Sequence, residues 1–294
     1  ADITWIDSFC LRLKEKQVAL EIYLKQLSEI NLPEEKAITD IHAELKSEFD
    51  AIGIELELFT ELSADNADFT QVMDQFTSRA GKLISSKKTA DNIHKIATQI
   101  TDKKTAIQLM VLASDIATHG FGIGEIHLRI NAVQLRNSMR AVDGRGVTTT
   151  GGNASSRLLI DRLSKRIETE QPWQINFANL DAETATARRQ LMLATQIIKH
   201  IDCDQPIRLL IAECERPVTL MSALYLGHKF GIAENLDISP LFETVLGLER
   251  GEQIIEQLMA NKVWMDYVRK RGRLSIQTGF SDAGRFLGQI AANL

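Results

Sequence analysis

Two acidic side chains, Glu243 and Asp282, are the best candidates for chemistry because each lies at the end of an apolar, strand-like run. Glu243 closes the run LDISPLF, and an amphipathic helical pattern follows it. Asp282 follows LSIQTGFS, which alternates apolar and polar residues up to its glycine. The order strand, helix, strand is typical of parallel α/β units, in which functional side chains lie at the carboxyl ends of the strands. We therefore predict that both acids occupy that end of a sheet.

Four strand-like runs, each followed by a helical pattern, have charged residues at or just after their ends. The runs begin near Glu125, Ile207, Leu236 and Leu274. The second run, IRLLIA, is typical of a strand buried on both faces of a parallel sheet. Glu213 and Glu215 follow it. Surface loops are also charged, so the pattern alone leaves open whether these residues share one site.

The sequence predicts two regions. Residues 1–119 are expected to be helical without a strand, and residues 120–294 are expected to form an α/β region. Apolar residues recur at helical spacing along the first region. We expect Thr89 and Asp102 to cap two of its helices, and one helix to end near Gly53. The glycines of HGFGIG break the helical pattern and mark the boundary. They precede a strand, whereas the glycines of a dinucleotide site follow one, so they predict no phosphate site.

The composition excludes two classes of partner. Lys and Arg number 34 and Asp and Glu number 39, so no basic field attracts nucleic acid or an anionic membrane. No run approaches the roughly 18 apolar residues of a membrane span. The three cysteines, Cys10, Cys203 and Cys214, are widely spaced, which favours a reducing compartment, and we expect a cytoplasmic protein. Cys214 has no histidine near it and is typical of a packing residue rather than a nucleophile.

Three phrases of the sequence match the wording of one known family. Residues 240–244 read PLFET, which the family shares, and residues 279–285 read GFSDAGR, where the family has GYSDSGK. Upstream, residues 121–129 read FGIGEIHLR, where the family has FGxxLxxxDIR. By these phrases, in this order and at this spacing, the chain resembles phosphoenolpyruvate carboxylase. The resemblance extends from about Phe69 to Leu294.

The resemblance implies a fold, a reaction and a set of site residues. The implied fold is helix-rich α/β: a partial (β/α) barrel of the phosphoenolpyruvate/pyruvate-domain kind, with an N-terminal helical region. Members carboxylate phosphoenolpyruvate with bicarbonate, through carboxyphosphate and an enolate, to give oxaloacetate and phosphate. They use Mg2+ or Mn2+ and generally work as homotetramers with allosteric effectors. By the same resemblance, Glu243 and Asp282 bind the metal, Arg129 is catalytic and binds substrate, and Arg285 binds substrate.

These roles fit the chemistry of the side chains. Mg2+ prefers oxygen ligands and takes one or two carboxylates besides water and substrate oxygens, so two acids on neighbouring strands suffice. A guanidinium suits a phosphate or a carboxylate because its planar fork donates two charge-assisted hydrogen bonds. Spacing alone would equally allow Arg129 to be a surface residue.

Departures from the family's wording keep a second class of function open. Phe280 stands for a Tyr, and Arg285 stands for a Lys, which keeps the charge but changes the donor geometry. Glu213 and Glu215 stand at uncharged positions of the family. The alternative is a catalytically silent homologue, or a helical interaction module, that keeps the scaffold.

The family's catalytic histidine loop and its His-Gly-Arg-Gly-Gly loop have no counterpart in this sequence. The chain also begins without Met and ends inside a helical pattern. We therefore expect an incomplete segment of a homo-oligomeric parent protein, inactive or poorly active when isolated.

Overall fold

The computed structural model describes residues 4–30, 36–63, 68–78, 83–122, 125–143, 153–204 and 206–279. Contacts between residues group the chain into two compact units. The first comprises Ala1–Glu125 with Gln196–Gln205, and the second comprises Ile126–Thr195 with Pro206–Leu294. The predicted domain division after residue 119 stays a prediction.

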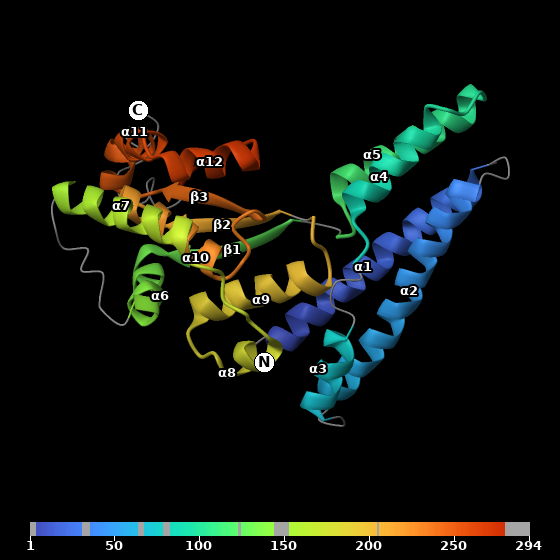
Figure 1. The fold of residues 1–294 in the computed structure, drawn as a ribbon, viewed down its shortest axis with the longest axis horizontal. Coiled ribbons are helices and arrows are strands. Elements are labelled where there is room, and N and C mark those ends of the chain that lie inside the picture. The colour runs from blue at the N-terminus through green and yellow to red at the C-terminus, as the bar shows by residue number, and fades with distance from the viewer. Residues whose placement is uncertain are drawn as a thin grey trace. The chain divides into compact units, whose positions relative to one another are not determined.

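Helices build the described part of the first unit before Glu125. They are α1 (Trp5–Glu29), α2 (Lys36–Ser63), α3 (Phe69–Thr77), α4 (Ser86–Ala97) and α5 (Lys103–His119). Helix α1 lies beside α2, and α4 lies beside α5 (Figure 1). Phe9, Phe59 and Phe76 form an aromatic core among α1, α2 and α3, with ring centroids 5.2 to 5.4 Å apart. Among the described residues no strand precedes Glu125, as the sequence predicted.

Of the two predicted helix caps, one is confirmed and one is wrong. Asp102 caps α5, because its Oδ2 accepts a hydrogen bond of 2.9 Å from the backbone N–H of Thr105. Helix α4 is capped instead by Ser85, whose Oγ accepts from the N–H of Lys88 at 3.1 Å. Thr89 lies buried inside α4. The helix begins one turn earlier than its apolar spacing indicated, because polar residues form its first turn.

Gly53 lies inside α2, so the predicted helix end near it is wrong. Buried apolar residues continue on the same face past it, since Leu45, Ile52 and Phe59 are 1%, 0% and 0% exposed. Their burial outweighs the roughly 1 kcal/mol by which a glycine disfavours a helix. Tertiary packing therefore carries α2 through a residue that local propensity would treat as a stop.

A parallel four-stranded sheet forms the centre of the second unit. Its strands are β1 (Ile126–Asn131), β2 (Ile207–Ala212), β3 (Leu236–Phe242) and β4 (Gln277–Thr278), in the order β1-β2-β3-β4. The register pairs Ile126 with Ile207, Ile207 with Leu236, and Leu241 with Gln277. The predicted parallel strands are thus confirmed, although β4 has two residues rather than the five predicted from Leu274.

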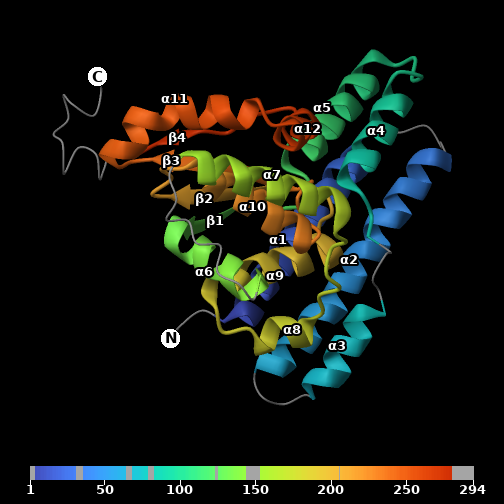
Figure 2. The ribbon, with the colours of Figure 1, turned by 60° about the vertical axis from the view of Figure 1, so that its left-hand side comes forward.

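The second unit also contains helices, some of which pack on the sheet. They are α6 (Ala132–Asp143), α7 (Asn153–Thr169), α8 (Phe177–Ala182), the first part of α9 (Thr186–His200), α10 (Pro217–Lys229), α11 (Val245–Met259) and α12 (Lys262–Arg271). Helix α6 packs against β1, while α10 and α11 pack against β3. Helices α7 and α10 lie side by side (Figure 2). All seven residues of β3 are buried, as expected of a parallel strand with helices on both faces.

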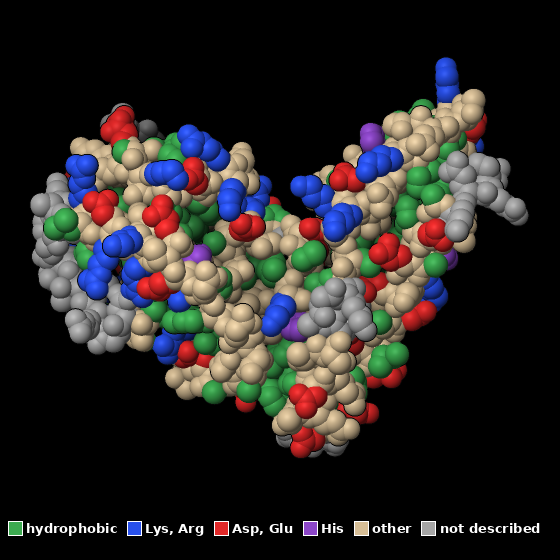
Figure 3. Space-filling view, in the orientation of Figure 1, with side chains coloured by type: hydrophobic (Ala, Val, Ile, Leu, Met, Phe, Trp, Pro, Cys, Tyr) green, Lys and Arg blue, Asp and Glu red, His purple; other side chains and the backbone are tan. Residues whose placement is uncertain are grey.

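The surface of the second unit carries both signs of charge. Lys and Arg side chains lie among Asp and Glu side chains over α12 (Figure 3), where Lys262 pairs with Asp266 and Lys270 pairs with Glu234. Mixed charges of this kind build no single-sign field over this helix. In the segments that the structure describes, no helix has the length and apolar character needed to cross a membrane.

Candidate functional site

Three residues that sequence reasoning singled out come together where β1, β2 and β3 end, and we call this place the carboxyl edge. Arg129 lies in β1, Glu213 directly follows β2, and Glu243 directly follows β3. Nη2 of Arg129 lies 3.7 Å from Oε2 of Glu243. Parallel strands put their carboxyl ends on the same side of a sheet, which explains the proximity of residues more than a hundred positions apart.

The two partners of this ion pair differ in exposure. The side chain of Glu243 is 8% exposed, whereas that of Arg129 is 63% exposed. An ion pair with such an exposed partner contributes about 0–1 kcal/mol to folding. Arg129 therefore adds little to stability and presents its guanidinium to solvent beside a nearly buried carboxylate.

Residues that directly follow two other strands, Glu213 and Gly279, lie against Glu243. Its Oε1 accepts a hydrogen bond of 3.2 Å from the N–H of Glu213, at the end of β2. On the other side, the N–H of Gly279 donates to the carbonyl of Phe242 at 3.0 Å, just after β4. A Cβ atom added to Gly279 would lie 2.6 Å from Cβ of Glu243. Only glycine allows the chain after β4 to pass so close to this side chain.

Two of the predicted site residues, Asp282 and Arg285, lie outside the described residues. The predicted pairing of Glu243 with Asp282 and the predicted substrate contact of Arg285 therefore stay predictions. The structure does bring Glu243 and Arg129 together. It also places Gly279, the last described residue, next to Glu243.

Glu215 belongs to the same edge through a helix cap. Thr244 is the N-cap of α11, and its Oγ1 accepts the N–H of Gly247 at 3.0 Å and donates to Oε1 of Glu215 at 2.8 Å. Sequence reasoning did not assign this role to Thr244. The signal was present, since a threonine directly before an amphipathic helix is a typical N-cap.

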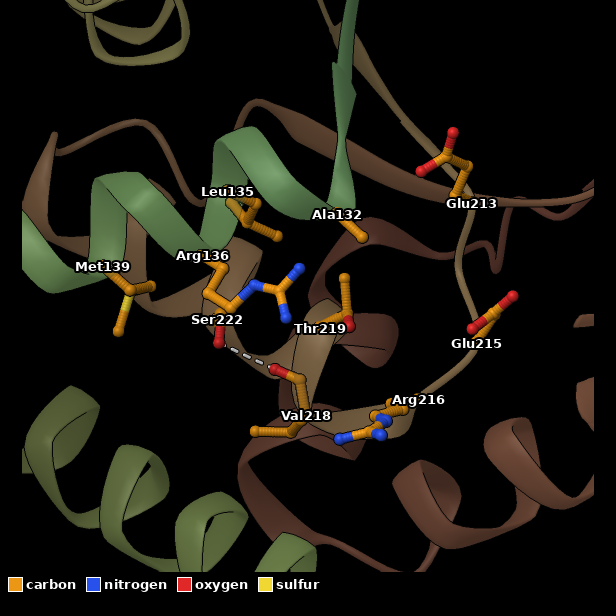
Figure 4. Close-up of a pocket in the computed structure, with 10 residues that line it drawn as sticks. All are labelled: Ala132, Leu135, Arg136, Met139, Glu213, Glu215, Arg216, Val218, Thr219 and Ser222. Atoms are coloured by element: carbon orange, nitrogen blue, oxygen red, sulfur yellow. Dashed lines mark hydrogen bonds between the residues drawn. The ribbon is translucent and has the colours of Figure 1, made fainter. Parts of the chain in front are cut away.

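A cavity of about 150 Å³ adjoins Glu213 and Glu215 between α6 and α10. Figure 4 shows the guanidinium of Arg136 projecting into it from α6 toward Thr219, while both Glu carboxylates lie toward the opposite side. By volume it would hold about five water molecules, at the roughly 30 Å³ that each occupies in the liquid. Sequence reasoning missed Arg136, because nothing in a helical pattern indicates which charged residue faces a cavity.

The oxygen chemistry of the edge fits a hard divalent cation, with Glu243 as one ligand. Mg2+ needs only one or two carboxylates besides water and substrate oxygens. Within the described residues, no group of three or more His, Cys, Asp or Glu side chains is arranged to hold a metal ion. Glu213 and Glu215 therefore do not complete a three-acid site with Glu243.

Cys214 is not a nucleophile. Its side chain is buried, and burial raises the pKa of its thiol to about 12. A thiol with so high a pKa is almost wholly protonated at neutral pH and packs as a small apolar group. None of the three cysteines forms a disulfide bond in the structure.

Comparisons with known proteins point to one family. The family model described as "Phosphoenolpyruvate carboxylase" matches residues 52–294. Similar curated relatives include phosphoenolpyruvate carboxylases of three bacteria. That of Corynebacterium diphtheriae is 22% identical over 63% of this chain and 22% of its own length. That of Thermus sp. is 29% identical over 29% of this chain and 10% of its length. That of Marinomonas sp. is 33% identical over 28% of this chain and 9% of its length. The chain thus spans about a tenth to a fifth of these relatives.

Proposed function

This chain belongs to the phosphoenolpyruvate carboxylase family, and we propose on that premise that its carboxyl edge is part of an active site that carboxylates phosphoenolpyruvate. The reaction takes bicarbonate as its second substrate and gives oxaloacetate and phosphate. One observation carries the proposal: Arg129 in β1 and Glu243 after β3, which match the family's phrases, lie 3.7 Å apart at the carboxyl edge of the same parallel sheet. The nearly buried carboxylate and the exposed guanidinium are the cation ligand and the anion ligand that this chemistry needs.

Glu243 and Asp282 would hold Mg2+ or Mn2+. When bound, the cation would supply positive charge that stabilises negative charge on the substrate's oxygens. Arg129 would bind the phosphate or the carboxylate of the substrates through its two-pronged donor geometry and fix their orientation. Arg285 would add a second cationic donor for substrate.

The wider architecture follows from the same premise. We propose that β1 to β4 form half of an eight-stranded (β/α) barrel, whose other strands would pair with the outer edges of β1 and β4. The parent protein would be a cytoplasmic homo-oligomer. The wide spacing of its three cysteines in the sequence supports a reducing compartment.

The proposal is tested by oxaloacetate formation in the complete protein, with phosphoenolpyruvate, bicarbonate and Mn2+, followed through reduction to malate. We expect Glu243→Gln to lower kcat/KM at least a hundredfold, about what is lost when one charge-stabilising group is removed from an active site. Glu249→Gln is the matched control, because Glu249 is exposed on α11. Equal turnover by Glu243→Gln and the wild type would overturn the proposal. No turnover by a wild type that binds Mn2+ would favour the catalytically silent homologue.

A further inference from the structure

Glu213 has an unusual backbone conformation. Its φ is +56°, and it is the one non-glycine residue with a positive φ among the residues that the structure describes. The left-handed region costs an ordinary L-residue about 1 kcal/mol or more, and such conformations persist where surrounding contacts fix them. Glu213 directly follows β2, at the carboxyl edge.

Hydrogen bonds on both sides of this residue fix the turn. Strand β2 pairs with β3 up to Ile211 opposite Pro240. Beyond the turn, the N–H of Cys214 donates to the carbonyl of Leu241 at 3.4 Å. Between these two points the N–H of Glu213 leaves the strand pairing and donates to Oε1 of Glu243 at 3.2 Å. The left-handed turn thus converts a backbone donor of the sheet into a donor for the site carboxylate.

The side chain of Glu213 is exposed and takes no part in a group of three metal-binding side chains within the described residues. Its contact with Glu243 comes from the backbone alone. This contact leaves Oε2 of Glu243 on the side of Arg129.

We propose that Glu213 is a positioning residue that acts through its left-handed backbone. Its N–H holds Oε1 of Glu243 and turns Oε2 toward the place where the cation and substrate bind. This inference rests on the proposed function, since it assumes that Glu243 binds the divalent cation. It assigns no role to the Glu213 carboxylate.

The test ranks substitutions in the complete protein by how well they tolerate a positive φ. Glycine and asparagine enter this region readily, alanine does so less well, and a β-branched residue is a genuine outlier there. Mn2+ affinity is measured by calorimetry for Glu213→Gly, Glu213→Asn, Glu213→Ala and Glu213→Val, with thermal unfolding as the check on folding. Glu243→Gln serves as the reference for loss of the cation ligand.

We expect the Gly and Asn variants to bind Mn2+ within about twofold of the wild type, although both lack the carboxylate. The Val variant should bind about tenfold more weakly, the loss expected for one hydrogen bond to a charged group, with Ala between. Equal affinity in all four variants would overturn the proposal, and so would equal weakening in all four, which would assign the role to the side chain. If Glu243→Gln binds Mn2+ as the wild type does, the proposed function falls as well.

Discussion

Glu243 is the residue on which the contacts of the carboxyl edge converge. Its carboxylate accepts a hydrogen bond from the N–H of Glu213 and pairs with Arg129, and Gly279 packs against its side chain. These partners come from three other strands or strand ends. A side chain held from three directions keeps one carboxylate orientation, which is what a cation ligand requires.

Arg129→Gln should weaken substrate binding without weakening the fold. The lost ion pair is exposed, so the free energy of unfolding should change by less than about 1 kcal/mol. If Arg129 binds an anionic substrate group, KM for phosphoenolpyruvate should rise about ten- to hundredfold, the loss expected for hydrogen bonds between charged groups.

Arg250→Gln provides the control, because Arg250 is exposed on α11. Arg129→Lys keeps the charge but not the planar fork, so its KM should lie between those of the wild type and the Gln variant. An unchanged KM in Arg129→Gln would contradict the substrate role and identify Arg129 as a surface residue.

At this scale, the sequence indicated side chains but not backbone roles. Glu243 could be singled out because it closes an apolar run, and Arg129 because it lies in a phrase that resembles the family's. The left-handed φ of Glu213 and the close approach of Gly279 could not, because both depend on chain segments about 30 to 36 positions away in sequence. No local propensity encodes such long-range contacts.

At the scale of elements, Gly279 joins the end of β4 to the end of β3. Gly279→Ala should destabilise the protein by about 1–3 kcal/mol, because its Cβ would overlap Cβ of Glu243 and the backbone would have to move. The midpoint temperature of thermal unfolding and the affinity for Mn2+ should both fall, because the same backbone shift displaces the Glu243 carboxylate.

Gly272→Asn is the matched control for this change. Gly272 ends α12 with φ +67°, and a Cβ there would meet no atom within 4 Å. Asparagine tolerates that conformation, so stability and Mn2+ affinity should stay close to those of the wild type. If Gly279→Ala leaves stability and Mn2+ affinity as unchanged as this control does, the close approach of Gly279 to Glu243 contributes to neither.

Ion pairs of the buried Asp237 with two more exposed arginines connect the start of β3 to the end of α12 and should make stability depend on pH. Asp237 is 3% exposed and pairs with Arg271 at 2.7 Å and with Arg273. Burial alone would raise the pKa of Asp237, but hydrogen bonds and charge from both arginines outweigh burial and lower it. Its stabilisation is therefore complete above the unfolded pKa of about 3.9 and is lost as the pH falls through the lower folded pKa.

Asp237→Asn should lower the free energy of unfolding at pH 7 by about 3 kcal/mol, as expected when a buried pair loses one partner. The difference from the wild type should shrink below about pH 4, because there the Asp237 carboxylate takes up a proton in the unfolded chain before it does so in the folded protein. Denaturant unfolding between pH 3 and pH 7 measures this. Asp266→Asn, in an exposed pair on α12, should leave the free energy of unfolding nearly unchanged at every pH. If the free energies of unfolding of Asp237→Asn and the wild type differ by the same amount from pH 3 to pH 7, the ion pairs do not cause the pH dependence.

The sequence predicted the strands well and the helix ends less well. Parallel strands buried on both faces leave continuous apolar runs, such as IRLLIA, which are easily found. A helix starts where one of several polar side chains accepts a hydrogen bond from a backbone N–H of its first turn. In α4 that side chain belongs to Ser85 rather than to Thr89. Burial also extended α2 past Gly53, where local propensity predicted an end.

At the scale of the whole molecule, the 294 residues span about a tenth to a fifth of the curated relatives cited. The described strands form an open sheet with β1 and β4 at its edges. We expect the isolated chain to form oxaloacetate poorly or not at all, because a closed barrel needs eight strands and the matching phrases cover only part of the site. The coupled oxaloacetate assay with Mn2+ measures this directly. Turnover at ordinary enzyme rates by these 294 residues would show that this part is sufficient.

The central claim, a divalent-cation site at Glu243, is tested most directly by anomalous diffraction from crystals of the complete protein grown with Mn2+. The account predicts an anomalous peak about 2 Å from a carboxylate oxygen of Glu243, with Asp282 as a second protein ligand. The peak should disappear in Glu243→Gln and persist in Glu249→Gln. A Mn2+ peak that is absent from this edge, or that remains there in Glu243→Gln, would contradict the account.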